Sequence, residues 1–255
     1  MTYSLIADHS SLEQAAPRIR GEGRIALDCE AAGFHRYTDS LCLVQLSTPK
    51  ETFLIDPMEM DPSDLLRPIL EDPAIQVVMH GADFDLRLLH RDLGIRLQGL
   101  FDTQTAATLL GVDSIGLASV LEEFLGVSLS KAHQRADWGQ RPLPEKLLAY
   151  AADDTRHLLA LRDVLAHRLG EAGRSEWAEE EFRTLEDTQW EPDDADPVTR
   201  VKGARRLSPR ELAGLRVALD WRDRIARARD RAPFRVVGDS VRSAVVERRP
   251  ASGAG

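Results

Sequence analysis

Two carboxylates stand two residues apart at the end of a short apolar run. Asp28 and Glu30 follow residues 25–27, whose apolar side chains predict a buried strand. Side chains two apart on a strand share a face, so these carboxylates should lie side by side. Such a pair needs a cation, a shared proton or water, because like charges repel and burial opposes ionisation. Taken alone, a pair of this kind is more often two solvated acids at a strand end, and only further acids from elsewhere in the chain would indicate a site.

A second pair of acids follows a later predicted strand. Asp83 and Asp85 stand in the first turn of a helix that begins after His80. The helix macrodipole favours an acid at this position, which by itself accounts for one of the two. Asp85 is expected to face back toward the strand ends, so it is the acid that can join the first pair.

The last acidic element lies on a long predicted helix. Tyr150 and Asp154 are four residues apart and therefore share a helix face, together with several leucines. That face is expected to be buried, whereas Asp153 lies about 100° round the helix and should be solvated. A carboxylate on a packed face without a basic neighbour is unusual, although a plain hydrogen-bonded Tyr–Asp pair is also consistent with this spacing.

Together the sequence offers four carboxylates from three separate elements: Asp28, Glu30, Asp85 and Asp154. Hard divalent cations such as Mg²⁺ are held by a few carboxylates with waters and substrate phosphates. Two such ions about 3.5–4 Å apart can stabilise both the attacking and the leaving oxygen of a phosphodiester displacement. The sequence contains no glycine-rich phosphate loop, GxSxG elbow or HExxH motif that would favour another chemistry.

The elements that would position these acids predict an α/β domain. Three strands joined by short connections predict an antiparallel meander, and a fourth strand between helices predicts parallel pairing. The predicted strands, with a weaker one at the start, cover residues 4–8, 25–30, 41–47, 52–55 and 75–79. Helices are expected over 11–20, 63–72, 117–125 and 144–169, and further helices begin near residues 83, 103 and 208.

The net charge of −9 is unevenly distributed along the 255 residues. Residues 199–255 contain 15 Lys and Arg against 6 Asp and Glu, a charge of +9, and the remainder carries −18. A basic tail on an acidic body suggests contact with a polyanion through the tail. The absence of a long apolar run and of a secretory signal argues against a membrane protein, and two cysteines, Cys29 and Cys42, fit a reducing cytoplasm.

Taken together, the motifs resemble a known family. DxE at a strand end, HxAxxD after a later strand and Tyr-x-x-x-Asp on a late helix are similar to the three motifs of the DEDDy 3′–5′ exonucleases. LCLVQLS, FDTQTAATLLG and ADWGQRPL resemble ribonuclease D in spacing and order, over roughly residues 20–190. Asp85, not Asp83, matches the second motif, and Tyr150 matches the tyrosine form of the third. Cys29 departs from the family's usual Thr, at a position on the opposite strand face.

The resemblance implies a ribonuclease H-like mixed sheet flanked by helices and a two-metal mechanism. Asp28, Glu30 and Asp154 would bind a first Mg²⁺ or Mn²⁺ ion, and Asp28 and Asp85 would serve the second. Tyr150 would orient the attacking water by hydrogen bonding, because an unperturbed pKa near 10 makes it a poor base. The expected reaction releases 5′-mononucleotides from the 3′ end of single-stranded RNA, in the maturation of transfer RNA or other structured RNA.

The C-terminal segment resembles the HRDC domain, a small helical nucleic-acid-binding unit. The resemblance covers 212–237, and the sequence stops near where later helices of that module would begin, so a truncated all-α segment is expected. The predicted division is an exonuclease domain over 1–190, a polar linker over 191–203 and the HRDC-like segment over 204–255.

Weaker expectations concern the substrate. The candidate substrate-binding residues are His80, Lys131 and Gln134. His80 follows a core strand and would line the cleft. The alternative for Lys131 and Gln134 is a solvated loop. Trp138 is expected to pack beside the Tyr helix, and Asp102 to cap a helix rather than bind metal. Two alternatives stay open: a 3′–5′ exonuclease on DNA, since the motifs do not select the sugar, and a catalytically silent nucleic-acid-binding scaffold. A cytoplasmic monomer is expected.

Overall fold

The structure is a computed structural model that describes residues 3–130, 133–192 and 194–238. The chain folds into two compact units. The first consists of Met1–Ala31 and Ser40–Trp190, and the second of Ala32–Asp39 and Glu191–Gly255. The second unit therefore includes a short loop from within the N-terminal half of the sequence.

The first unit is built on a six-stranded mixed sheet in the order β1-β4-β3-β2-β5-β6. β3 runs antiparallel to both β2 and β4, whereas β1 is parallel to β4, and β2, β5 and β6 are parallel to one another. The strands are β1 (Tyr3–Ile6), β2 (Arg24–Ala31), β3 (Leu41–Ser47), β4 (Thr52–Ile55), β5 (Gln76–Met79) and β6 (Leu100–Asp102). The predicted antiparallel meander and the parallel fourth strand are confirmed.

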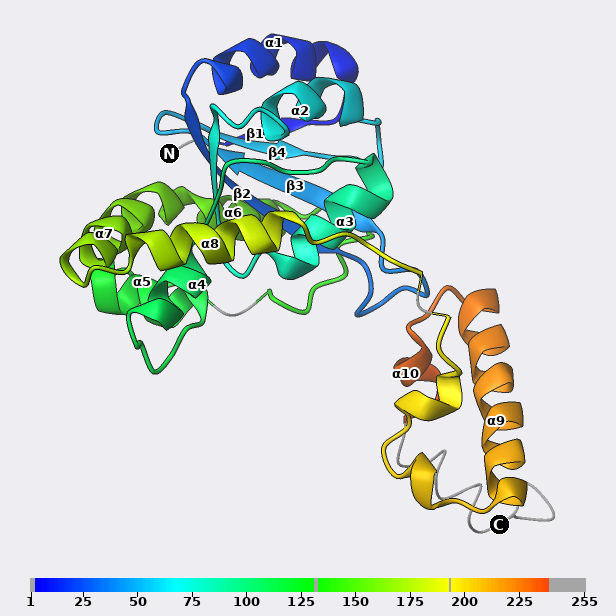
Figure 1. Ribbon diagram of the computed structural model, residues 1–255. Helices are drawn as coiled ribbons and strands as arrows, with labels where there is room; N and C mark the ends of the chain where they lie inside the picture. The colour runs from blue at the N-terminus through cyan, green and yellow to red at the C-terminus, as the bar shows by residue number, and fades with distance from the viewer. Residues whose placement is uncertain (1–2, 131–132, 193, 239–255) are drawn as a thin grey trace. The chain divides into compact units, whose positions relative to one another are not determined.

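Helices cover both faces of this sheet (Figure 1). On one face, α1 (His9–Arg20), α2 (Ser63–Leu70) and α3 (Asp83–Leu93) bury leucines and isoleucines against β2 and β3. The helices of the other face are α4 (Thr103–Leu109), α5 (Leu117–Leu125), α6 (Glu145–Arg156), α7 (Leu158–Glu171) and α8 (Ser175–Glu186). A strand that is covered on both faces has buried side chains on both faces, and every residue of β3 is buried.

Two parts of the sheet-and-helix pattern differ from the prediction. The single helix expected over 144–169 is two helices, α6 and α7, separated at His157, where the backbone leaves regular helical geometry at φ −104° and ψ −4°. The apolar pattern continues across this break, which is why the sequence does not reveal it. β6 has only three residues, too few for an alternating pattern to predict a strand.

The second unit has a small core of its own in its described part. Val198, Val201, Ala204, Leu215 and Leu219 are buried together. Its elements are η1 (Pro197–Arg200), η2 (Ala204–Arg206), α9 (Pro209–Ala228) and α10 (Pro233–Val236). Both valines come from the stretch that was predicted as a linker, so that stretch contributes apolar surface to this core. The expected start of α9 is confirmed by a capping box between Ser208 and Glu211.

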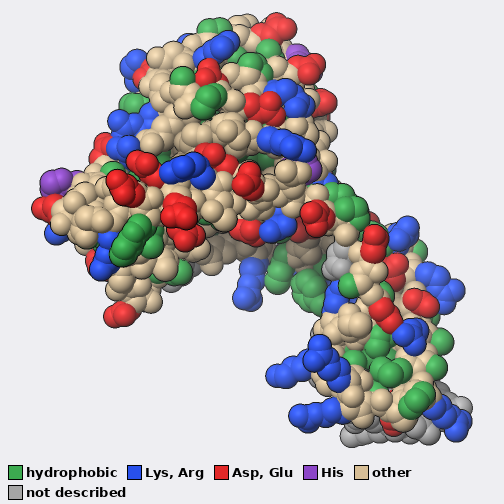
Figure 2. Space-filling view, viewed as in Figure 1, with side chains coloured by type: hydrophobic (Ala, Val, Ile, Leu, Met, Phe, Trp, Pro, Cys, Tyr) green, Lys and Arg blue, Asp and Glu red, His purple; other side chains and the backbone are tan. Residues whose placement is uncertain are grey.

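The loop Ala32–Asp39 belongs to this second unit through specific contacts. The Tyr37 hydroxyl donates to Asp223 Oδ1 at 2.8 Å and accepts from Arg227 Nη2 at 2.9 Å. The Ala232 amide donates to the carbonyl of His35 at 3.1 Å. Figure 2 shows Lys and Arg side chains on the visible face of this unit. The sequence gives no local signal for this grouping, because its two parts are separated by about 150 residues along the chain.

Candidate active site

The end of β2 carries the first two acids of the site. Asp28 and Glu30 lie two apart in an extended strand and share one face of the sheet. A register shift between Glu30 and Ala31 ends the regular pairing with β3 at this point. One carboxylate oxygen from each of Asp28, Glu30 and Asp154 lies within 4.8 Å of the other two. Acids 124 residues apart in the sequence thus form one cluster.

α6 brings Asp154 and Tyr150 to the same cluster. The helix packs on the sheet through a buried face that includes Ala151 and Thr155, and the Thr155 hydroxyl is hydrogen-bonded to that of Ser47 on β3 at 2.7 Å. The Tyr150 hydroxyl donates a hydrogen bond to the Asp154 carboxylate one turn later. The i,i+4 spacing therefore makes a Tyr–Asp pair on a helix face that is fixed against the sheet.

The first turn of α3 supplies the fourth acid. Asp85 is buried, with 7% of its surface exposed, and its carboxyl group is hydrogen-bonded to that of Asp28. Asp83 is exposed and pairs with Arg87 at 2.9 Å along the helix. The sequence prediction that Asp85 rather than Asp83 faces the strand ends is confirmed.

The carboxyl groups of this cluster oppose one another's ionisation. Burial, followed by the charges of Asp28 and Asp154, raises the pKa of Glu30 to about 10. Burial and the charge of Asp28 raise the pKa of Asp154 to about 8. Burial also raises the pKa values of Asp28 and Asp85. The pKa of Tyr150 lies above its usual range, because burial and the nearby acids disfavour a phenolate.

Within the described ranges, no Lys, Arg or His forms an ion pair with any of the four acids. Buried carboxylates are normally paired or bound to metal. An all-oxygen donor set in a tight cluster is what a hard divalent cation requires. The residues therefore fit a divalent metal ion, which would replace the missing positive charge.

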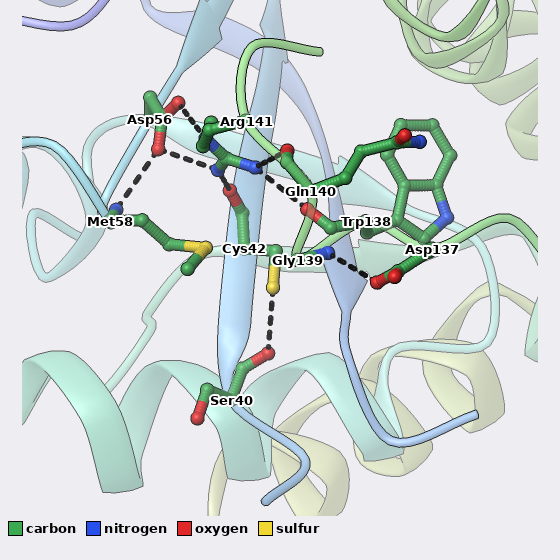
Figure 3. Close-up of polar contacts among 9 residues, drawn as sticks. All are labelled: Ser40, Cys42, Asp56, Met58, Asp137, Trp138, Gly139, Gln140 and Arg141. Carbon is green, nitrogen blue, oxygen red and sulfur yellow. Dashed lines mark hydrogen bonds and ion pairs between the residues drawn. The ribbon is translucent and has the colours of Figure 1, made fainter. Parts of the chain in front are cut away.

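The loop before α6 is held by a different carboxylate. Arg141 donates from Nε and Nη2 to the two oxygens of Asp56, each at 2.7 Å, as Figure 3 shows. Its remaining donors reach the carbonyls of Cys42, Trp138 and Gln140 at 2.7–2.8 Å. The guanidinium thus joins this loop to the ends of β3 and β4, and the chain enters α6 from a fixed position.

Two aromatic side chains of that loop surround Tyr150. The rings of His133 and Tyr150 meet edge to face at 5.7 Å, and Trp138 lies 6.2 Å from Tyr150 between centroids. Trp138 is 2% exposed, which confirms the prediction of a packing residue. A hollow of about 290 Å³ is lined by Leu129, Ser130, His133, Lys146, Ala149, Tyr150, Asp153 and Asp154. No sequence pattern predicts a partner for His133, because its contact with Tyr150 is tertiary.

The remaining sequence candidates lie in different surroundings. His80 follows β5, and its Nδ1 donates to the Thr103 hydroxyl at 2.9 Å, while that hydroxyl donates to the carbonyl of Met79. Burial lowers the pKa of His80. Gln134 is exposed, and Lys131 lies outside the described residues.

Asp102 has the structural role that the sequence predicted. Its carboxylate accepts from the amide of Thr105 at 2.6 Å as the cap of α4, and from the amide of Ala82 at 2.8 Å. The second contact also fixes the start of α3, from which Asp85 projects. The Asp102 carboxylate therefore positions the starts of α3 and α4 by accepting hydrogen bonds from their backbone amides.

Comparisons with known proteins agree with this geometry. The 3′–5′ exonuclease domain matches residues 3–170, and the HRDC domain matches residues 211–254. Ribonuclease D of Pseudomonas paraeruginosa is 35% identical over 89% of this chain, and Exosome complex component 10 of Mus musculus is 31% identical over 96% of it. The crystal structure of Escherichia coli RNase D superposes with a TM-score of 0.76 at 33% identity, covering 99% of this chain and 68% of that one.

The fold and the matched domain define the class of the protein: the chain belongs to the 3′–5′ exonuclease family, with an HRDC domain behind the exonuclease domain. Within that family it is similar to ribonuclease D and to the exosome exonucleases. The chain spans 60% of the Pseudomonas ribonuclease D and 29% of the mouse exosome component. Among the described residues, no helix has the length and apolar character needed to cross a membrane.

Proposed function

We propose that the chain is a 3′–5′ exoribonuclease that hydrolyses RNA from its 3′ end and releases 5′-mononucleotides. The observation that carries the proposal is the cluster of four acids, which no basic side chain of the described ranges neutralises. Asp85 is buried and the other three are half-buried, and Tyr150 lies one turn before Asp154 on α6. Membership of the exonuclease family supplies the reaction class that such a cluster serves.

The four acids would hold two divalent cations, Mg²⁺ or Mn²⁺. Asp28, Glu30 and Asp154 are the ligands for one ion, because their oxygens already converge. Asp28 and Asp85, joined by a hydrogen bond, would serve the second. When bound, such ions lower the pKa of a coordinated water and stabilise the charge that develops on the scissile phosphate.

Tyr150 would act as a hydrogen-bond donor rather than as a base. Its hydroxyl keeps its proton at neutral pH, since burial and the neighbouring carboxylates raise its pKa. The hydrogen bond to Asp154 fixes the side chain on the wall of the hollow. The hydroxyl is therefore placed to orient an attacking water or a substrate oxygen.

The preference for RNA rests on the relatives. Proteins named ribonuclease D match most of this chain, and the E. coli structure is described as an exoribonuclease involved in structured RNA processing. We infer a single-stranded 3′ end of a transfer RNA or another structured RNA as substrate, with the basic second unit contributing to binding. A cytoplasmic, monomeric enzyme remains the prediction.

The test uses a single-stranded RNA and a DNA of the same sequence, both 5′-labelled, incubated with Mg²⁺, Mn²⁺ or EDTA. We expect a ladder that shortens from the 3′ end of the RNA, with mononucleotide products and no cleavage in EDTA. Asp85→Asn should abolish it, whereas the matched control Asp83→Asn should not, because Asp83 is exposed and paired with Arg87. Cleavage of DNA alone would overturn the substrate, and binding without cleavage would favour the silent scaffold.

A further inference from the structure

A glutamine in the middle of the sheet lacks the partners that its amide requires. Gln45 on β3 is 0% exposed, and within the described part of the chain neither its Nε2 nor its Oε1 has a hydrogen-bond partner. A buried amide without a partner destabilises a folded protein, whereas an apolar side chain of similar size does not. Packing alone therefore does not explain an amide in this mostly apolar strand.

The position of Gln45 links it to the acidic cluster. It pairs in register with Asp28 across the antiparallel β2–β3 ladder, so both side chains project from the same face. The Cβ atoms of such a pair are about 4.5–5.5 Å apart. A hydrogen bond of about 2.9 Å between Gln45 Nε2 and an Asp28 oxygen is within reach of these side chains.

The surroundings leave the amide few other directions. Ser47, two residues further along β3 on the same face, is already hydrogen-bonded to Thr155 on α6 and to Thr52 on β4. The register partner of Gln45 on β4 is the apolar Leu54. Asp28 is therefore the polar group that the strand register places beside the amide.

We propose that Gln45 is a positioning residue for Asp28: its Nε2–H donates to the Asp28 carboxylate when the site holds a divalent cation. The inference rests on the cation site proposed above. Carboxylates that bind metal are commonly oriented by further hydrogen bonds, which fix the oxygen that faces the ion. A neutral amide suits this role, because Lys or Arg at the same place would compete with the cation for Asp28.

The test compares Gln45→Met with the unmodified full chain in the absence of RNA. Mn²⁺ binding is measured by titration calorimetry, and thermal unfolding is followed in EDTA and in Mn²⁺. We expect Mn²⁺ affinity to fall about 10-fold, as for other residues that orient ligands. In EDTA the melting temperature should be unchanged or higher, because the variant removes a buried amide without partners. Gln76→Met is the matched control: Gln76 opens β5 and pairs with Arg24, at the other end of β2 from the acids, so the variant should leave Mn²⁺ affinity unchanged.

The pattern of results separates the possible roles. Unchanged Mn²⁺ affinity, or a melting temperature lowered equally in EDTA and Mn²⁺, would overturn the proposal and assign the amide a purely structural role. Unfolding of Gln45→Met and also of Gln45→Leu in EDTA would overturn it in the same way. If the unmodified chain binds no Mn²⁺, the proposed function itself fails. If Asp154→Asn abolishes binding and Gln45→Met does not, the positioning role alone fails.

Discussion

The first unit holds carboxylates away from bulk solvent in two places, and only one of the two has a basic partner among the described residues. Asp56 is 3% exposed, and Arg141 donates a hydrogen bond to each of its two carboxylate oxygens (Figure 3). At the end of β2, Asp28, Glu30 and Asp154 converge with no basic partner among the described residues. The protein thus supplies a guanidinium cation to the carboxylate that holds a loop. Where the four acids meet, no side chain of the described residues supplies a positive charge.

The difference separates an acid with a structural partner from the acids that we propose to bind metal. Every N–H group of a guanidinium needs an acceptor when it is buried, and five hydrogen bonds engage Arg141. Burial, followed by neighbouring carboxylates, instead raises the pKa values of Glu30, Asp85 and Asp154. This is a cost to the metal-free fold that an external cation or protons can relieve. Sites that destabilise the isolated protein in this way are where function is expected.

The largest effect is expected from Asp154→Asn. Exonuclease activity should fall by at least about 10³-fold, because a neutral amide replaces a carboxylate ligand of the cluster. The melting temperature in EDTA at pH 8 should hold or rise, since one of several like charges is removed. Initial rates on labelled RNA and a thermal scan measure the two quantities. Retained activity would contradict the site assignment.

Arg141→Met should have the opposite signature. Removing one partner of a buried ion pair leaves Asp56 unpaired, and we expect a loss of about 3 kcal/mol in unfolding free energy. Denaturant unfolding measures it. Arg168→Met, which breaks the exposed pair with Glu171, serves as the control and should cost less than about 1 kcal/mol. Equal losses of unfolding free energy for the two variants would show that the Asp56–Arg141 pair stabilises the fold no more than an exposed ion pair does.

Tyr150→Phe should affect turnover more than binding. The variant keeps the ring that packs against Trp138 and removes only the hydroxyl. We expect kcat to fall by about 10²-fold, while KM for RNA and the affinity for Mn²⁺ change little. Steady-state kinetics at several Mn²⁺ concentrations test this. A rise in KM with normal kcat would instead assign Tyr150 to substrate binding.

The smallest effect concerns positive charge that lacks an acidic partner. Lys202, Arg205, Arg206 and Arg210 in the second unit are exposed, and none of the ion pairs of the described residues engages them. Replacing all four with Gln should weaken RNA binding several-fold and reduce its salt dependence, by about 0.7 in log–log slope for each lost contact. An unchanged slope would exclude these residues from the RNA interface. Gln at four exposed positions of α8 provides a control for surface substitution.

The positions of the four acids could be predicted because local periodicity determines them. The two-residue repeat of a strand pairs Asp28 with Glu30, and the helical repeat pairs Tyr150 with Asp154. The order of strands and helices then brings their ends to one edge of the sheet. The structural role of Asp102 was also predictable, since an acid just before a helix commonly caps it.

Other features depend on contacts that no local pattern contains. Asp56 and Arg141 are 85 residues apart, and Tyr37 and Arg227 are 190 apart, so only the folded chain reveals them. Gln45 stands inside the run LCLVQLS, where a polar residue among apolar neighbours does not disturb the prediction of a strand. Its significance emerges only from the register that places it opposite Asp28.

The most direct measurement is thermal unfolding against pH, in EDTA and in Mn²⁺. Folded-state pKa values of about 8 for Asp154 and 10 for Glu30 lie above the unfolded values near 4. The stabilising effect of these protons is therefore complete below about pH 4, and it is lost as the pH rises through the folded-state values. The Mn²⁺-induced rise in melting temperature should grow from pH 5 to pH 8, as the cation replaces protons, and Asp154→Asn should abolish most of it. A Mn²⁺ effect that is absent, or equal at every pH and in the variant, would contradict a cation-binding cluster.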